Sequence, residues 1–150
     1  MRTASSTIRF LNTADLKAVE GLASVAKSEG FRFLDRLLNE LEAQTLELDA
    51  ADNFYLCVVH DDEIVGIGGV THDPYADGPA VGRIRHVYIH PAHRRSGLGR
   101  LLIRKIETHA RDAYSVLRLR TDTPGGARFY EALGYAAVSD RAATHVRSNV

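Results

Sequence analysis

The chain has little of what small secreted proteins and membrane proteins depend on. Its single cysteine, Cys57, excludes an internal disulfide, and the lack of a C-x-x-C pair excludes a cysteine-based zinc site. No apolar run approaches the roughly 18 residues that a membrane-spanning helix needs, and the first residues contain no apolar core of a secretory signal. We therefore expect a cytoplasmic protein with no bound metal and no membrane partner.

Low-complexity tracts, internal repeats and Pro/Gly/Ser-rich linkers are also absent, so one domain is predicted over residues 1–150. The net charge is zero, but the two halves differ. Residues 1–82 hold 6 Lys and Arg against 14 Asp and Glu, whereas residues 83–150 hold 13 against 5. The second half is expected to face an anion. Charge alone does not choose between nucleic acid, a phosphorylated small molecule and simple neutralisation of one half by the other.

Hydrophobic periodicity predicts the element order β-α-α-β-β-β-α-β-α-β-β. Hairpins come first and crossover helices later, which favours a mixed, mostly antiparallel α/β sheet flanked by helices. Thr13 is the expected N-cap of the first helix. Strands are predicted at residues 8–10, 54–60, 64–70, 81–90, 116–120, 135–138 and 144–147, and helices at 16–26, 33–48, 97–109 and 124–133.

The densest signal is the segment from Arg94 to Arg100, Arg-Arg-Ser-Gly-Leu-Gly-Arg, between a predicted strand and a predicted helix. Glycines in such a turn let backbone N–H groups converge, and the helix N-terminus adds about half a positive charge. The alternative is a plain glycine-rich turn with solvated arginines. The strand before the turn and the amphipathic helix after it favour a pyrophosphate site.

This R-x-x-G-x-G segment is neither a P-loop nor a G-x-G-x-x-G dinucleotide fingerprint. Residues 87–102 resemble motif A of the GCN5-related N-acetyltransferases, the GNAT family. Residues 127–135, Ala-Arg-Phe-Tyr-Glu-Ala-Leu-Gly-Tyr, resemble the family's motif B ending, and the two segments occur in the family's order. The resemblance implies a GNAT-like fold and acetyl-CoA as cosubstrate. It covers about residues 81–135 in sequence and the first 80 residues only in topology.

Site residues are implied by the resemblance. The strand at residues 117–121 is expected to splay from the strand at 81–90 and open a slot for the pantetheine arm. Thr123 stands where relatives often have Asn, and it is expected to cap the last helix. The implied contacts with coenzyme A come from Val87, Tyr88, Ile89, Arg94, Arg95, Ser96, Gly97, Leu98, Gly99, Arg100, Thr123, Gly126, Phe129 and Tyr130.

Tyr130 matches the family tyrosine that protonates the leaving thiolate, and its alternative role is core packing beside Phe129. The general base stays open between His86, His72 and a water chain. Alternation places Arg83, Arg85, Val87 and Ile89 on one face of their strand, unless a bulge before Val87 swaps the faces. An arginine cannot act as a base. Residues proposed to contact the acceptor are Arg83, Arg85, Phe31 and Tyr75, with pairing to the acidic first helices as the alternative for Arg83.

The expected function is acetyl transfer to a primary amine by direct attack in a ternary complex. The two arginines slightly favour a small acceptor that carries an anion over a protein amine. The alternative is a coenzyme A-binding regulatory module without turnover. Nucleic acid is not an expected partner, because the arginines cluster at the start of a helix whose apolar face is turned inward. A homodimer is left open.

Overall fold

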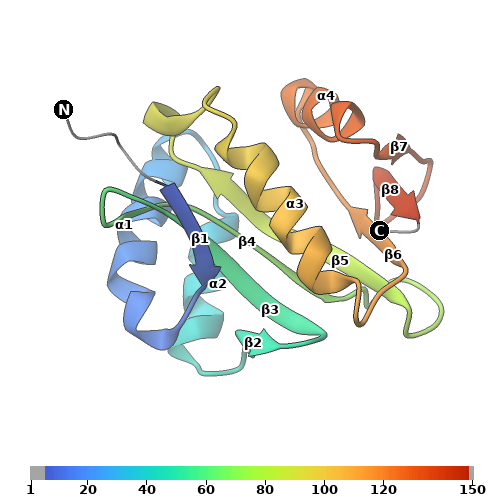
Figure 1. Cartoon of the computed structure of the whole chain (residues 1–150), viewed down its shortest axis with the longest axis horizontal. Helices are drawn as coiled ribbons and strands as arrows, with labels where there is room; N and C mark the ends of the chain where they lie inside the picture. The colour runs from blue at the N-terminus through green and yellow to red at the C-terminus, as the bar shows by residue number, and fades with distance from the viewer. Residues whose placement is uncertain (1–5, 149–150) are drawn as a thin grey trace.

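The computed structural model describes residues 6–148, whose strands form one sheet in the order β1-β3-β4-β5-β6-β8-β7, with β2 paired to β3 (Figure 1). Strands β5 and β6 are parallel, and the other neighbouring pairs formed by these residues are antiparallel. The strands are β1 (Ser6–Phe10), β2 (Asp49–Ala50), β3 (Asn53–His60), β4 (Glu63–His72), β5 (Val81–Ile89), β6 (Val116–Leu119), β7 (Ala136–Ala137) and β8 (His145–Ser148). The predicted mixed sheet is confirmed, with β2 as an unpredicted addition.

Helices cover both faces of this sheet, and each face has its own core (Figure 1). The helices are α1 (Leu16–Ser28), α2 (Phe33–Glu42), α3 (Leu98–Ala110) and α4 (Pro124–Ala132). The core on one face joins α3 and α4 to the sheet, and the core on the other face joins α1 and α2 to it. None of the helices formed by residues 6–148 combines the length and apolar character that crossing a bilayer requires.

Two predicted boundaries in the first helical pair are wrong. Asn12, not Thr13, is the cap: its side chain accepts a hydrogen bond from Ala14 N, and Asp15 accepts one from Asn12 N in return. A short 3-10 turn therefore precedes α1. The second helix ends at Glu42 instead of Leu48, because Gln44 takes a left-handed conformation, with φ of 56°.

Two adjacent glycines of β4 let both layers lie close to the sheet. A Cβ on Gly68 would point toward Val87 and the α3 side chains, at 3.1 Å from Val87 Cγ2. A Cβ on Gly69 would lie 2.6 Å from two atoms of the Tyr55 ring, on the α2 face. Tyr55 is fully buried. Consecutive residues face opposite sides of a strand, so this glycine pair leaves room for close packing on each side.

The two parallel strands separate soon after they meet. Their ladder joins Val81 to Val116, Gly82 to Leu117 and Arg83 to Arg118, and it goes no further. The rest of β5 has β4 on one edge, and no strand formed by residues 6–148 lies on the edge facing β6. The expected splay is therefore present, and it leaves an open edge of β5 along residues 84–89.

A bulge interrupts β5 at His86 and Val87, which together stand opposite Gly68 of β4. His86 has a left-handed backbone, with φ of 59°. Val87 and Ile89 consequently pack against the α3 core, and Tyr88 belongs to the α2 core. Simple alternation would have put Val87 and Ile89 with Arg85, so the bulge swaps the faces of this strand.

Candidate functional site

The loop before α3 carries a run of backbone donors that no described group uses. Within residues 6–148, no hydrogen bond is made by the N–H groups of residues 95–100. Arg95 and Gly97 are both left-handed, with φ of 64° and 83°, and Gly97 is the N-cap of α3 without a side-chain cap. Alternating left- and right-handed residues turn successive N–H groups toward one point, and the helix dipole adds positive potential there. A loop with this geometry is able to hold an anion.

Arg94, which the motif assigns to the same anion, is already engaged. Its guanidinium donates two hydrogen bonds to Glu29, at 2.9 and 2.7 Å, and its Nε donates to Ile89 O at 2.9 Å. The Tyr88 hydroxyl donates to the same carboxylate, and Arg94 also lies over the Tyr88 ring. Hydrogen bonds from Arg94 and Tyr88 lower the pKa of Glu29. Arg94 therefore fastens the α1–α2 turn to the end of β5.

The side chains left free for an anion come from other positions. Arg95 and Arg100 form no ion pair within residues 6–148, and neither does Arg128 of α4. The Ser96 hydroxyl donates to His93 O at 2.5 Å and shapes the loop. Leu98 is buried in the core, so only its backbone is available.

The helix α4 approaches the first turn of α3 across the splayed strands. A Cβ on Gly99 would lie 3.3 Å from the Phe129 ring, so this glycine lets α4 come close. Thr123 accepts a hydrogen bond from Gly126 N at 3.0 Å, and the predicted cap of α4 is confirmed. Strand β5 carries three of the predicted cofactor contacts, Val87, Tyr88 and Ile89. The Tyr88 side chain, however, faces the α2 core.

Tyr130 is buried among aromatic rings. It is 7% exposed, and its ring centroid lies 5.0 Å from that of Phe129 and 5.7 Å from that of Tyr135. Its hydroxyl makes no hydrogen bond within residues 6–148. Burial raises the pKa of Tyr130, so the hydroxyl stays protonated throughout the neutral pH range.

His86 stands on the other face, at the bulge. Its Nδ1 lies 2.8 Å from the Tyr55 hydroxyl, and its ring is 6.4 Å from that of Phe33 on α2. Burial and the nearby charges of Arg85 and Arg36 lower the pKa of His86 to about 3. The imidazole is therefore neutral at ordinary pH. Phe31 lies in the turn before α2, with its ring 6.4 Å from that of Tyr88.

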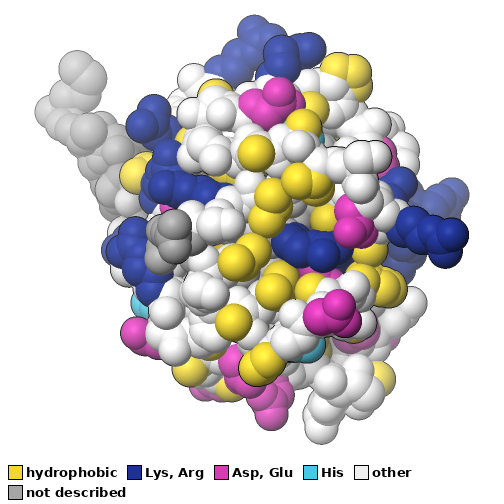
Figure 2. Space-filling view, turned by 90° about the vertical axis from the view of Figure 1, so that its right-hand side faces the viewer, with side chains coloured by type: hydrophobic (Ala, Val, Ile, Leu, Met, Phe, Trp, Pro, Cys, Tyr) yellow, Lys and Arg dark blue, Asp and Glu magenta, His cyan; other side chains and the backbone are white. Residues whose placement is uncertain are grey.

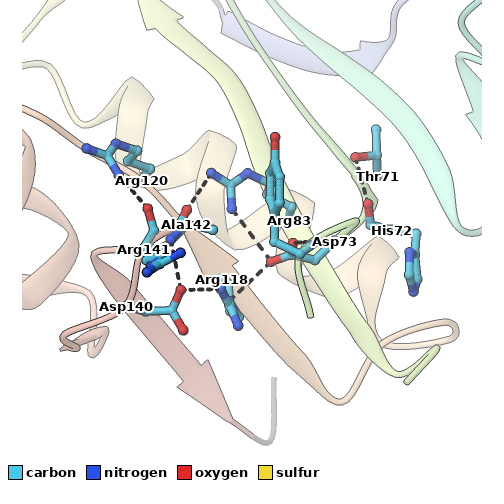
Figure 3. Close-up of polar contacts among 10 residues, drawn as sticks. Thr71, His72, Asp73, Arg83, Arg118, Arg120, Asp140, Arg141 and Ala142 are labelled. Carbon is cyan, nitrogen blue, oxygen red and sulfur yellow. Dashed lines mark hydrogen bonds and ion pairs between the residues drawn. The ribbon is translucent and has the colours of Figure 1, made fainter. Parts of the chain in front are cut away.

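The vertex where β5 and β6 part is held by a buried ionic cluster (Figure 3). Asp73 is fully buried, with Oδ2 at 3.1 Å from Arg118 Nε and 3.6 Å from Arg83 Nη1. Arg83 also donates to Ala142 O at 2.7 Å, and Arg118 to Asp140 at 3.2 Å. The cluster ties the loop between β7 and β8 to the vertex. Arg83 thus has a partner, but in the loop after β4 and not in the first helices.

Two other expected site residues lie beside this vertex. Tyr75 is 67% exposed, with its ring 5.2 Å from the Arg83 guanidinium carbon. His72 is exposed at the end of β4, with Nε2 at 3.1 Å from Gly78 O (Figure 3). Its strand partner is Gly82, four residues before His86, or about 13 Å of extended chain. The structure therefore does not bring His72 and His86 together.

Glu29, Tyr55 and Asp73 were missed by sequence reasoning. Each takes its role from partners 10 to 65 residues away. Only Asp73 carried a local signal, since it is an acid that directly follows a buried strand.

The face that carries α4, β7 and β8 has hydrophobic side chains gathered across its middle (Figure 2). Lys and Arg side chains lie mainly at the top and along the margins of this view, with acidic side chains between them. On this face the excess positive charge of the second half does not form one continuous basic patch.

Comparisons with known proteins point in one direction. A model of the Acetyltransferase (GNAT) family matches residues 18–135. A candidate acetyltransferase from Exiguobacterium sp. 255-15 has a similar structure, with a TM-score of 0.82 and 26% identity over 96% of this chain and 93% of that one. A search of curated proteins finds no match.

Two further similar structures contain a bound coenzyme. The Salmonella typhimurium yncA protein, a candidate acetyltransferase solved with acetyl-CoA, has a TM-score of 0.71 and 21% identity over 95% of this chain and 90% of that one. The PaiA N-acetyltransferase of Thermoplasma acidophilum, in complex with coenzyme A, has a TM-score of 0.68 and 17% identity over 97% and 99%. At these identities the likeness concerns the fold.

Proposed function

Because this chain belongs to the GNAT acetyltransferase family, we propose that it transfers the acetyl group of acetyl-CoA to a primary amine. One observation carries the proposal: the N–H groups of residues 95–100, which make no hydrogen bond to any described residue, follow the end of β5, and the edge of β5 that faces β6 has no strand neighbour beyond Arg83 within residues 6–148. A pyrophosphate fits the first feature, and an amide-containing arm fits the second, because it can add to an open strand edge.

In the proposed reaction the amine nitrogen attacks the thioester carbonyl carbon. A C–N bond forms, the C–S bond breaks, and the coenzyme leaves as a thiolate that takes up a proton. The bulge at His86 and Val87 interrupts the ladder with β4, and we assign the N–H of Val87 to the carbonyl oxygen, where negative charge develops. Tyr130 is the proposed proton donor to the thiolate, since burial keeps its hydroxyl protonated.

The pKa of His86 decides how the amine loses its proton. Moving a proton from an alkylammonium with a pKa near 10 to an imidazole with a pKa of about 3 spans roughly 7 units, or about 10 kcal/mol. That cost is too large for His86 to act as the first base. We infer that the amine binds in its neutral form, having lost its proton to water, and that His86 serves as a neutral hydrogen-bonding group.

Two measurements test the proposal. Acetyl-CoA at about 100 times its dissociation constant should stabilise the chain by roughly 2.7 kcal/mol. For a domain of this length that corresponds to a rise in Tm of about 5–10 °C, and ADP should give less. Thiol release from acetyl-CoA should then depend on added primary amine. Stabilisation without turnover for any amine would indicate a coenzyme A-binding module, and the absence of stabilisation would overturn the assignment of the loop.

Tyr130→Phe separates binding from chemistry. It should keep the stabilisation by acetyl-CoA and lower kcat by about 100-fold or more, the usual contribution of a general acid. Tyr114→Phe is the matched control, because Tyr114 is equally buried but donates its hydroxyl to Asp52 O, away from α4. The control should lower stability and leave kcat unchanged. Equal kcat in wild type and Tyr130→Phe would exclude Tyr130 as the acid.

A further inference from the structure

A half-buried guanidinium without a partner lies one residue before the β5 bulge. Arg85 makes no hydrogen bond or ion pair within residues 6–148. The contrast with Arg83, two residues earlier, is sharp, because Arg83 binds both Asp73 and Ala142 O. A partly desolvated charge costs free energy unless an anion compensates it. Arg83 is therefore engaged within the fold, whereas the Arg85 guanidinium is available to a ligand.

The strand register fixes the face on which Arg85 lies. Arg85 stands opposite Gly69, and directly opposed residues of an antiparallel pair share a face. A Cβ on Gly69 would meet the Tyr55 ring, so this is the face of Tyr55, His86 and α2, opposite α3. Arg85 also lies beyond the last rung of the β5–β6 ladder, on the part of β5 that has no strand neighbour on its β6 side within residues 6–148.

A second unpaired guanidinium approaches the same place from α2. The Phe33 ring is 6.4 Å from His86, and Arg36 follows Phe33 by one helical turn, on the same side of α2. Arg36 is exposed and forms no ion pair within the part of the chain that the structure describes. The charges of both Arg85 and Arg36 act on His86 and lower its pKa.

The acid one helical turn after Arg36 forms no ion pair with either arginine among the described residues. Glu40 follows Arg36 by one turn of α2, and its charge acts on Tyr55. It forms no ion pair with Arg36 or Arg85 among the described residues, and its Oε2 is buried without a hydrogen bond. The positive charges of Arg85 and Arg36 both act on His86, and within residues 6–148 neither is compensated by an ion pair.

We propose that Arg85 and Arg36 form a subsite for a carboxylate of the acceptor, which is then a small amine that also carries a carboxylate, such as an amino acid. The proposal rests on the proposed acetyl transfer and adds the chemical class of its acceptor. It also replaces Arg83 by Arg36 in the expected acceptor site, because Arg83 is engaged in the vertex cluster.

The test compares acceptors that differ only in the carboxylate. Acetylation of an amino acid and of its amide is followed by thiol release at equal concentrations of neutral amine, which removes the effect of their different amine pKa values. We expect kcat/KM to be about 10- to 100-fold higher for the amino acid, the range of a charge-assisted hydrogen bond. Equal values, or preference for an amine within a peptide, would overturn the subsite.

Substitutions test whether Arg36 and Arg85 cause the preference for the amino acid over its amide. Arg36→Gln and Arg85→Gln should each reduce the ratio of kcat/KM between amino acid and amide, mostly by raising the KM of the amino acid. Arg32→Gln should keep the ratio, because Arg32 is the N-cap of α2 and also forms no ion pair with any described residue. Arg36 is exposed, so its variant is expected to fold even where Arg85→Gln does not. An unchanged ratio in Arg36→Gln would overturn its assignment.

A binding readout separates failure of the subsite from failure of the proposed function. With coenzyme A present, the amino acid should raise the Tm of wild type more than its amide does, and Arg85→Gln should lose that difference. Transfer to amides with no effect of the carboxylate would refute the subsite alone. No transfer to any amine, despite stabilisation by acetyl-CoA, would refute the proposed function and the subsite with it.

Discussion

Gly69→Ala tests how closely the α2 layer lies against the sheet. The new Cβ would stand 2.6 Å from two atoms of the Tyr55 ring, well inside van der Waals contact. The ring has no room to retreat, because Tyr55 is fully buried and its hydroxyl is hydrogen-bonded to His86 Nδ1 at 2.8 Å. Either the ring moves and breaks that bond, or β3 and β4 shift.

The magnitude follows from three terms. Overpacking a buried site costs about 1–3 kcal/mol. Loss of the bond to His86 costs about 0.5–1.5 kcal/mol. The reduced backbone freedom of alanine in the unfolded chain returns about 0.4–1 kcal/mol. The net loss is about 0.5–4 kcal/mol, which lowers the Tm of a 150-residue domain by roughly 1–16 °C.

Thermal unfolding compared with a matched variant checks the reasoning. Gly21→Ala places the same Cβ in the middle of α1, where it meets no atom within 4 Å. It should raise stability by about 0.5–1 kcal/mol, because glycine is unfavourable inside a helix. A Gly69→Ala variant as stable as wild type, beside a stabilised Gly21→Ala, would refute the close approach of Tyr55 to β4.

Two more predictions concern the residues that hold α3. Burial disfavours the charged form of Glu107, but hydrogen bonds from Arg104, Tyr135 and Arg147 outweigh burial and lower the pKa of its carboxyl group. The ionised Glu107 therefore stabilises the fold above about pH 4.5, and this stabilisation is lost as the pH falls through the folded pKa. Glu107→Gln should lower the free energy of unfolding by about 1–3 kcal/mol at pH 7 and should make it less dependent on pH below pH 4.5, as measured by urea unfolding across pH. An unchanged slope of the unfolding free energy against pH would contradict this. Gly97→Ala places a side chain on a left-handed N-cap, so it should cost about 1 kcal/mol and weaken coenzyme A binding, although its Cβ would meet no atom within 4 Å. Gly97→Asn should cost less, because asparagine tolerates this conformation. Equal losses of coenzyme A affinity for the two variants in calorimetric titrations would count against the left-handed geometry of the loop.

The fold was predictable where local chemistry and periodicity agree. Gly97 before an amphipathic stretch, and Thr123-Pro124 before another, mark the starts of α3 and α4, and both helices begin there. The end of α2 was not predictable in this way. Leu46 and Leu48 extend the apolar pattern, but both reach the core from a loop after the left-handed turn at Gln44. Periodicity reports which side chains are buried, and it does not report the backbone that buries them.

In the candidate site, too, local features were predictable from the sequence and contacts between distant elements were not. The backbone loop at residues 95–100 follows from glycine spacing, a local property, so the sequence predicts it well. Partners of charged side chains depend on contacts between distant elements. Arg83, Arg85 and Arg94 look alike in the sequence, yet only the fold assigns Asp73 to the first and Glu29 to the third. The sequence left open a bulge before Val87, and the structure contains it at His86 and Val87, where no residue type demands a left-handed backbone.

The contacts of Arg94 change how the proposed anion site would work. A guanidinium that holds Glu29 with two hydrogen bonds, and Ile89 O with a third, has little left for a phosphate. The attraction for the anion must then come mainly from the backbone N–H groups of residues 95–100 and from Arg95 and Arg100. Arg94 contributes by fixing the turn between α1 and α2 against the end of β5. That turn leads into α2 and Arg36, so one ion pair links the loop of the proposed anion site to the helix of the proposed acceptor subsite.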